Sequence, residues 1–482
     1  MNIIDLAATI IWEYMWGMPL VLLLMFAGAW MTYKSGFFQF RYFKRTMKYC
    51  MQSLFGRKSR VDGQGAGLLN QLQATSMALG TTIGVGNIGG VATAIAVGGP
   101  GAVFWMWISG LFGMALKMSE ITLAVHYRNQ DDNGETYGGP TYYIEKGIKR
   151  EKNLKNVFKI LNTLFITGAL STLVINIQTY TVSEAIGNTF GISMVVVAVI
   201  YTALLYLMIG GGIKGLGKIA GILVPIMCLF YFVVGIFIII MNINLIPGII
   251  IMVVKSAFTG TAAFGGFMGA AVMVAIKTGI SRSVFSNEAG WGTAAMIHST
   301  AKVDHPVKQG MLGVFEVFVD TFVICSITCF VILISGEWST GLDGATLTLA
   351  AFESQIGYIG RVILAISVFI FGLTTSSGVY AQLEVVLRYI VGDTPLKVRL
   401  VNILKLIYPI PSLAMVLIAV YYGFPGTTLW LLSDGTTVLP IFANCIALLI
   451  LSRKFTELTR DYVARYIEKK KPETEIRVFY VD

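Results

Sequence analysis

The chain has 482 residues, of which 55% are hydrophobic and only 13% are charged. Soluble globular proteins carry about 25% charged residues, so this composition excludes a water-soluble enzyme, a disordered scaffold and a nucleic-acid-binding module. The net charge of +10 does not indicate a nucleic-acid partner, because the Lys and Arg residues stand mostly between apolar stretches, as they do in membrane proteins.

Long apolar stretches recur along the whole sequence. A helix needs about 20 apolar residues to cross a bilayer, and about eleven stretches meet this condition. The first is not a cleavable signal, because acidic Asp5 and Glu13 precede it and no small-residue cleavage site follows. We place the predicted spans at 16–33, 70–97, 101–126, 157–186, 192–210, 217–241, 254–280, 309–335, 359–390, 397–421 and 426–452.

The charges between these spans predict their orientation. The segment 34–60 holds eight Lys and Arg residues and no acid, so the positive-inside rule places it in the cytoplasm and the N-terminus outside. The loop 336–358 has acids but neither Lys nor Arg, which places it outside. The tail 453–482 has eight more Lys and Arg residues, and we expect it to lie at the cytoplasmic surface.

The ten spans after the first divide into two sets of five. The sequence therefore predicts a first span with its basic segment (1–69), two five-helix repeats (70–241 and 242–452) and a tail (453–482). The first helix of each repeat carries a glycine cluster, at 80–87 and at 259–267. Matched glycine-interrupted segments are the best sequence pointer to a transporter binding site. Because five is odd, the two repeats must have opposite orientations.

The first cluster predicts a broken helix at mid-membrane. A break at Gly84-Val85-Gly86 frees backbone N–H groups for an anion such as a carboxylate, and carbonyl groups for a hard cation such as sodium. Asn87 follows as a neutral ligand or cap. The alternative is that these glycines only allow close helix packing. The buried amides of Asn176 and Gln178 either contact substrate or tie helices together.

Four consecutive hydroxyls, Thr374-Thr375-Ser376-Ser377, occur in the apolar stretch 359–390. They suit a cation site, although hydroxyls in helices also bond the carbonyls one turn earlier. Intramembrane acids are functional candidates by default. For Glu120 we expect a structural ion pair with Lys117, one turn away. Glu316 and Asp320 share one helix face, where they join a cation path or tie the helix to the inner loop. Two further acids in spans are Glu184 and Glu384.

Other chemistries lack their motifs. The three histidines fall near predicted loops, so no proton relay through histidine is expected in mid-membrane, and the five cysteines show no metal-binding spacing. A phosphate-binding loop is absent from the sequence, so ATP-driven transport has no support.

Four motifs make the chain resemble the alanine or glycine:cation symporter family, the sodium:alanine carriers also called amino acid carrier proteins. They are Gly84-Val85-Gly86-Asn87-Ile88 with the following 98–107, Gly138-Gly139-Pro140, Phe285-Ser286-Asn287-Glu288-Ala289-Gly290, and Phe315-Glu316-Val317-Phe318-Val319-Asp320-Thr321. The resemblance covers nearly the whole chain. It implies an all-α integral membrane protein with a leucine-transporter-like fold: two inverted five-helix repeats plus one extra N-terminal helix.

The resemblance also implies a set of site residues. Sodium would be held by the carbonyls of Gly80, Ile83 and Phe371 and the hydroxyls of Thr374 and Thr375. Val379 stands where many family members have Trp, so the pocket is expected to be wider than in a typical alanine carrier. Phe264, Phe267, Gln178 and Val379 would set the substrate size. The predicted substrate site comprises Thr82, Gly84, Val85, Gly86, Asn87, Gln178, Phe264, Gly265, Gly266 and Val379.

These expectations define a function. The sequence predicts a monomeric, multi-pass cell-membrane symporter, not an enzyme. It would import a small neutral amino acid, alanine or glycine, with sodium as coupling ion and no cofactor. Glutamine or another larger neutral amino acid as substrate, and coupling to protons, stay open as alternatives. A channel is disfavoured, because it would show filter-type loops. An intramembrane enzyme is disfavoured as well, because it would need a nucleophile, base or metal ligands at mid-membrane.

Overall fold

A computed structural model describes residues 10–55, 68–130, 135–259, 268–472 and 476–480. Helices dominate it, and the one small sheet pairs β1 (Asn129–Gln130) with β2 (Thr136–Tyr137) in antiparallel register. The helices before the predicted repeats are η1 (Ile11–Met15), α2 (Met18–Lys34), α3 (Phe38–Arg41) and α4 (Phe43–Phe55). Those of the first repeat are α5 (Gln71–Thr82), η3 (Val85–Asn87), α6 (Gly89–Gly98), α7 (Gly101–His126), α8 (Pro140–Tyr143), η4 (Ile144–Glu151), α9 (Lys155–Val174), α10 (Gln178–Phe190), α11 (Met194–Gly210) and α12 (Gly212–Met241).

The segment predicted as the second repeat contains more short helices. Its elements are η5 (Ile243–Leu245), α13 (Ile246–Thr259), α14 (Met268–Asn287), α15 (Thr293–His298), α16 (Pro306–Val317), η7 (Phe318–Cys325), α17 (Ser326–Ser335), η8 (Glu337–Ser339), α18 (Gly344–Ile356), α19 (Tyr358–Val391), α20 (Leu396–Ile407), α21 (Pro409–Tyr422), α22 (Gly426–Tyr462) and η9 (Val463–Glu468).

Eight helices of the described chain are long and apolar enough to cross a membrane, and the bent pair formed by α5 with η3 and α6 makes nine. The sequence analysis expected about eleven. Of the remaining two, α11 is a shorter apolar helix. The predicted span 254–280 falls on α13 and α14 and on residues 260–267 between them, which lie outside the described residues.

The predicted break in the first repeat is present. The side chain of Asn70 caps α5, and the helix ends at Thr82 because Ile83 and Gly84 adopt extended backbone. The chain then makes the single turn η3 before α6 begins at Gly89. The helical segments before and after the break are bent by 48° relative to each other. Residues 81–90 are buried, so the interruption lies inside the protein.

Two further interruptions were not predicted. The span expected at 157–186 consists of α9 and α10, which are separated at 175–177. The span expected at 309–335 is π-helical over η7, and π-helical turns inside helices occur frequently at functional sites.

The predicted boundary of the tail at 453 does not coincide with a helix end. α22 continues to Tyr462, and residues 476–480 return to the end of α7, where the Tyr480 N–H donates to the His126 carbonyl.

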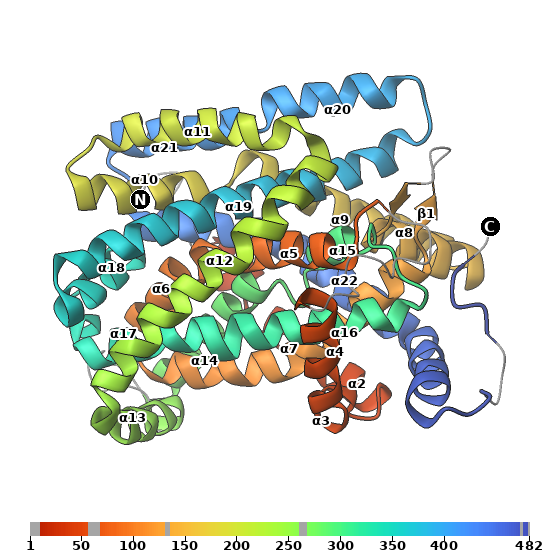
Figure 1. The fold of residues 1–482 in the computed structure, drawn as a ribbon, viewed down its shortest axis with the longest axis horizontal. Helices are drawn as coiled ribbons and strands as arrows, with labels where there is room; N and C mark the ends of the chain where they lie inside the picture. Colours follow the sequence, from red (N-terminus) through yellow and green to blue (C-terminus); the bar gives the residue numbers. More distant parts are fainter. Residues whose placement is uncertain (1–9, 56–67, 131–134, 260–267, 473–475, 481–482) are drawn as a thin grey trace.

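The broken helix lies near the centre of the bundle (Figure 1). α5 packs between α12 and α19, whereas α7 packs against α14 and α16. α11 and α21 lie together at one edge. The short elements α8 and β1 lie toward one end of the molecule and α18 toward the opposite end, whereas α15 lies beside α5.

Candidate functional site

The break in the first repeat faces the hydroxyl run of α19. The Thr375 hydroxyl donates to the Gly80 carbonyl at 3.0 Å, and a Cβ atom on Gly84 would lie 2.3 Å from the same hydroxyl oxygen. Gly80 in turn lies against Thr374, whose Cβ atom is 3.4 Å from the position of a Gly80 Cβ. The approach of α19 therefore requires glycine at position 84, whereas at position 80 the closest contact of a Cβ atom would be Val224 on α12, at 2.9 Å.

The residues expected to hold sodium come from these two segments. Thr374 donates to the carbonyls of Ile370 and Phe371 at 3.1 and 3.0 Å, which is the local bonding that hydroxyls commonly make in helices. Thr375 instead bonds across to α5. A hydroxyl keeps acceptor lone pairs while it donates. A cation between the two segments would therefore meet hydroxyl oxygens from α19 and carbonyl oxygens from α5 and α19.

The predicted substrate residues of the break lie between two helices. A Cβ atom on Gly86 would lie 3.2 Å from the Phe285 ring, on α14, and Val85 lies near Gly372 on α19. The side-chain oxygen of Asn87 accepts from the Gly84 N–H at 2.8 Å. The freed backbone at the break is thus partly satisfied by the chain itself.

The other predicted substrate residues have different surroundings. Gln178 is the first residue of α10, and its buried side-chain oxygen finds no hydrogen-bond partner within the described part of the chain. Val379 is half-buried on α19. The Thr82 hydroxyl donates to the Ala78 carbonyl and accepts from Lys117. Phe264, Gly265 and Gly266 lie outside the described residues, as does Phe267.

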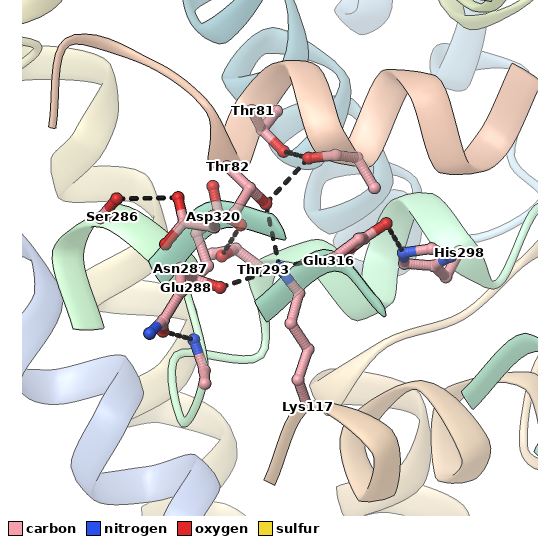
Figure 2. Close-up of polar contacts among 12 residues, drawn as sticks. Thr81, Thr82, Lys117, Ser286, Asn287, Glu288, Thr293, His298, Glu316 and Asp320 are labelled. Carbon is pink, nitrogen blue, oxygen red and sulfur yellow. Dashed lines mark hydrogen bonds and ion pairs between the residues drawn. The ribbon is translucent and has the colours of Figure 1, made fainter. Parts of the chain in front are cut away.

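Lys117 is the centre of a buried polar network that the sequence analysis did not predict (Figure 2). Its ammonium donates to the Thr82 hydroxyl at 2.9 Å and to the Asn287 carbonyl at 2.8 Å. It also forms an ion pair with Glu316 at 3.1 Å. The expected pair with Glu120 is wrong, because Glu120 accepts a hydrogen bond from Asn444 instead.

The same network contains a histidine. His298, at the end of α15, is completely buried and contacts Glu316 at 2.7 Å and Gln309 at 2.7 Å. The expectation that the histidines lie near loops therefore misses its burial. The position of His298 near a predicted loop gave no sign that α15 is buried inside the protein. Of the two roles left open for Glu316, tying its helix to the inner segment is the one that these contacts fit.

Asp320 has surroundings of another kind. One carboxylate oxygen accepts from Asn87 at 2.5 Å and from Ser286 at 2.8 Å, and the other accepts from Thr321 at 2.9 Å. Asp320 is fully buried. Among the described residues no Lys, Arg or His forms an ion pair with it, whereas buried Asp434 is paired with Arg282 through two hydrogen bonds.

Broken helices, a hydroxyl-lined crossing and buried polar groups within one apolar bundle define a multi-pass membrane protein of the secondary transporter class. Across the described chain, no group of three or more His, Cys, Asp or Glu side chains is placed to hold a metal ion. The model of the sodium:alanine symporter family matches residues 1–476. The chain belongs to this family.

Curated relatives agree with this assignment. The sodium/alanine symporter AgcS of Methanococcus maripaludis is 36% identical over 93% of this chain and 95% of its own length. The probable sodium/glutamine symporter GlnT of Bacillus subtilis is 34% identical over 98% and 92%. In both cases the match spans nearly all of the two proteins.

The fold has solved counterparts. MhsT in complex with L-phenylalanine covers 83% of this chain and 90% of its own, with a TM-score of 0.50 and 12% identity. An Eremococcus coleocola manganese transporter, solved with an aromatic bis-isothiourea compound, covers 82% and 86% with a TM-score of 0.51 and 15% identity. The predicted leucine-transporter-like, all-α membrane fold is confirmed.

Proposed function

We propose that this protein imports a small neutral amino acid, alanine or glycine, together with sodium by alternating access. The observation that carries the proposal is the contact between the broken helix and α19. There the Thr375 hydroxyl and the Gly80 carbonyl meet at 3.0 Å beside the backbone of Gly84. Neutral oxygens suit a hard monovalent cation, and N–H groups at a helix break suit a carboxylate.

A neutral substrate follows from the charges at the site. Lys117 is bound to Glu316, and Arg282 to Asp434, so neither cation is available to balance an acidic substrate side chain. Burying an uncompensated charge costs several kcal/mol. We therefore expect aspartate and glutamate to be poor substrates.

The decisive experiment is uptake by proteoliposomes that contain the purified protein. A panel of amino acids is offered with an inward sodium gradient, with a proton gradient and with neither. We expect sodium-driven uptake of alanine and glycine. Uptake that is equal with and without each gradient would contradict a symporter. Uptake driven by a proton gradient without sodium would identify the proton, and not sodium, as the coupling ion.

Glutamine is the second candidate substrate, because one observation favours it. The buried side-chain oxygen of Gln178 has no hydrogen-bond partner among the described residues, and leaving such an oxygen unpaired costs free energy. The side-chain amide of a bound glutamine could donate to it. GlnT, the relative described as a probable sodium/glutamine symporter, shows that the family name alone does not fix the substrate.

The glutamine candidate predicts an effect of Val379. If Val379 lines the pocket, Val379→Trp should fill it and abolish competition by glutamine for alanine uptake, while alanine uptake remains. The measurement is inhibition of labelled alanine uptake by unlabelled glutamine in the wild type and the variant. If glutamine fails to compete in the wild type, or competes equally in both, the wide pocket is wrong.

A further inference from the structure

The end of the chain is held on the end of α7. The Tyr480 N–H donates to the His126 carbonyl at 2.9 Å, and the ring nitrogen Nδ1 of His126 donates to the Val478 carbonyl at 2.9 Å. A carbonyl oxygen can only accept, so this ring nitrogen carries the proton. The two bonds fix the backbone of residues 478–480 independently of the side chains there. We call residues 476–480 the C-terminal strap.

Two aromatic side chains of the strap cover two cations. The centre of the Phe479 ring lies 5.0 Å from the Cζ atom of Arg128, and the centre of the Tyr480 ring lies 5.1 Å from the Lys146 ammonium. At these distances a cation is attracted to the face of an aromatic ring. The Tyr480 and Tyr127 rings also meet, with 5.4 Å between their centres. The strap therefore bridges the end of α7 and η4, which carries Lys146.

Arg128 connects the strap to the segment that follows α15. Its Nη1 atom donates to the carbonyls of Ser299 and Ala301 at 3.3 and 2.8 Å, while the Phe479 ring lies against the guanidinium. A guanidinium donates along its edge and stacks through its face, so both sets of contacts act at once and together fix its plane. Removing the ring would leave the orientation of the guanidinium less constrained.

The same segment is bound to the start of α5. The Thr300 carbonyl accepts from the N–H groups of Leu68 and Leu69 at 2.8 and 3.1 Å. The Lys302 N–H donates to the Leu69 carbonyl at 2.8 Å. Asn70, the next residue, caps α5. A continuous set of contacts therefore leads from the strap, through the guanidinium and this segment, to the first part of the broken helix.

α5 and α15 stand between the helix break and the predicted cytoplasmic side. α5 ends at the break, and its buried residues 74–82 pack beside the buried helix α15. α15 also packs against α7. In alternating access one set of helices moves against another around the binding site, so a substrate at the break reaches the predicted cytoplasm when these helices separate. A contact that ties them to α7 opposes this separation.

We propose that the C-terminal strap holds the predicted inner side closed, by keeping the segment 299–302 and the start of α5 against α7, and that it must detach for the inner side to open. Residues 476 and 478–480 are only half-buried, so the strap can leave without exposing the core of the bundle. Losing contacts that exist in the closed state alone shifts the population toward the open state. The inference rests on the proposed alternating access and adds its control by the end of the chain.

The test is the labelling rate of a cysteine introduced on α5 of the purified protein. Thr75 is completely buried and close to cysteine in size, so Thr75→Cys reports when water reaches this part of α5. The variant Phe479→Ala/Tyr480→Ala removes both rings of the strap. Two cation–ring contacts together change an equilibrium about 5- to 30-fold. With a small water-soluble thiol reagent, we expect the labelling of Thr75→Cys to accelerate by this factor.

Three controls accompany this measurement. Arg477→Ala changes an exposed side chain within the strap, and it should leave the labelling rate of Thr75→Cys unchanged. The protein without Thr75→Cys gives the background from the native cysteines. Thr189→Cys places a buried cysteine at the far end of α10, on the predicted outer side. Its labelling should not accelerate when the strap is weakened, whereas general loosening of the bundle would accelerate both sites.

A second variant keeps the test decisive if Phe479→Ala/Tyr480→Ala does not fold. Tyr480→Pro removes the N–H that donates to the His126 carbonyl, which is a contact independent of the two cations. We expect it to accelerate the labelling of Thr75→Cys in the same direction.

The possible failures can be told apart. Unchanged labelling of Thr75→Cys in the folded strap variants would overturn the inference, and so would equal acceleration of Thr75→Cys and Thr189→Cys. Both results would leave the proposed function intact, because labelling is measured without a substrate. A wild-type protein that takes up no neutral amino acid under any gradient would contradict the proposed function itself.

Discussion

At the scale of single residues, Gly84 and Thr375 show how closely the break and α19 fit. The Thr375 hydroxyl oxygen lies where a Gly84 Cβ would meet it at 2.3 Å. Glycine is therefore needed at this position because a side chain would clash with Thr375, in addition to favouring the helix break. Of the two explanations that the sequence left open, close packing is what this contact shows, and the binding site stays a prediction.

Thr375→Val tests whether the Thr375 hydroxyl oxygen binds sodium, because valine keeps nearly the same side-chain shape. It removes the hydroxyl that contacts the Gly80 carbonyl, so the sodium concentration for half-maximal uptake should rise about 10-fold or more. Thermal stability should change little. Ser377→Ala is the control, because the Ser377 hydroxyl bonds the Thr374 carbonyl within its own helix. Unchanged sodium activation in Thr375→Val would remove Thr375 from the ion site.

Gly84→Ala tests the contact from the other side. The added methyl group would overlap the Thr375 oxygen, so we expect loss of substrate binding and lower thermal stability. The double variant Gly84→Ala/Thr375→Ala restores the space but not the oxygen. Stability should recover while sodium activation stays impaired. If the double variant is as unstable as Gly84→Ala, the clash is not the cause.

The sequence identified many of these residues but not their partners. The glycine cluster, Asn87 and the hydroxyl run stood out because polar and flexible residues are costly in apolar helices. Asp320 was recognised as a candidate for the same reason. That Asn87 bonds Asp320, 233 positions away, depends on how η3 and η7 pack, and no local pattern contains this information.

At the scale of elements, one lysine ties three helices together. Lys117 of α7 bonds Thr82 at the end of α5, Asn287 at the end of α14 and Glu316 of α16. Local spacing suggested Glu120 because it lies one turn away. Packing of α7 against α16 placed Glu316 closer. The interruptions at 175–177 and in η7 escaped prediction because their residues lack the glycine clusters that marked the first break.

Lys117→Met should destabilise the protein by about 3–5 kcal/mol, because it leaves the Glu316 carboxylate buried without its ammonium partner. Lys117→Met/Glu316→Gln removes both charges and should recover a large part of this loss. The measurement is thermal unfolding of the detergent-solubilised protein for both single variants and the double variant. Additive losses would show that the two side chains act independently.

At the scale of the whole molecule, the distribution of charged residues predicts the orientation of the chain in the membrane, which the fold alone does not give. The cytoplasmic assignment depends on the basic segment 34–60 and the tail. Arg361, which follows the predicted outer loop 336–358, forms an ion pair with Glu353 of that loop at 2.6 Å. Its charge is therefore compensated locally, and the excess of positive charge stays on the predicted inner side.

Labelling of single introduced cysteines tests this orientation. Ser339 in the acidic loop and Lys44 in the basic segment are both exposed, whereas the native cysteines are buried except for partly buried Cys228, so background labelling should be low. With a membrane-impermeant maleimide on intact cells, we expect Ser339→Cys to react and Lys44→Cys to react only after permeabilisation. The positive-inside rule gives this direction because cations near the ends of spans stay on the cytoplasmic side during insertion. The reverse pattern would invert the protein in the membrane and place the end that carries α15 and the Lys117–Glu316–His298 network on the outside.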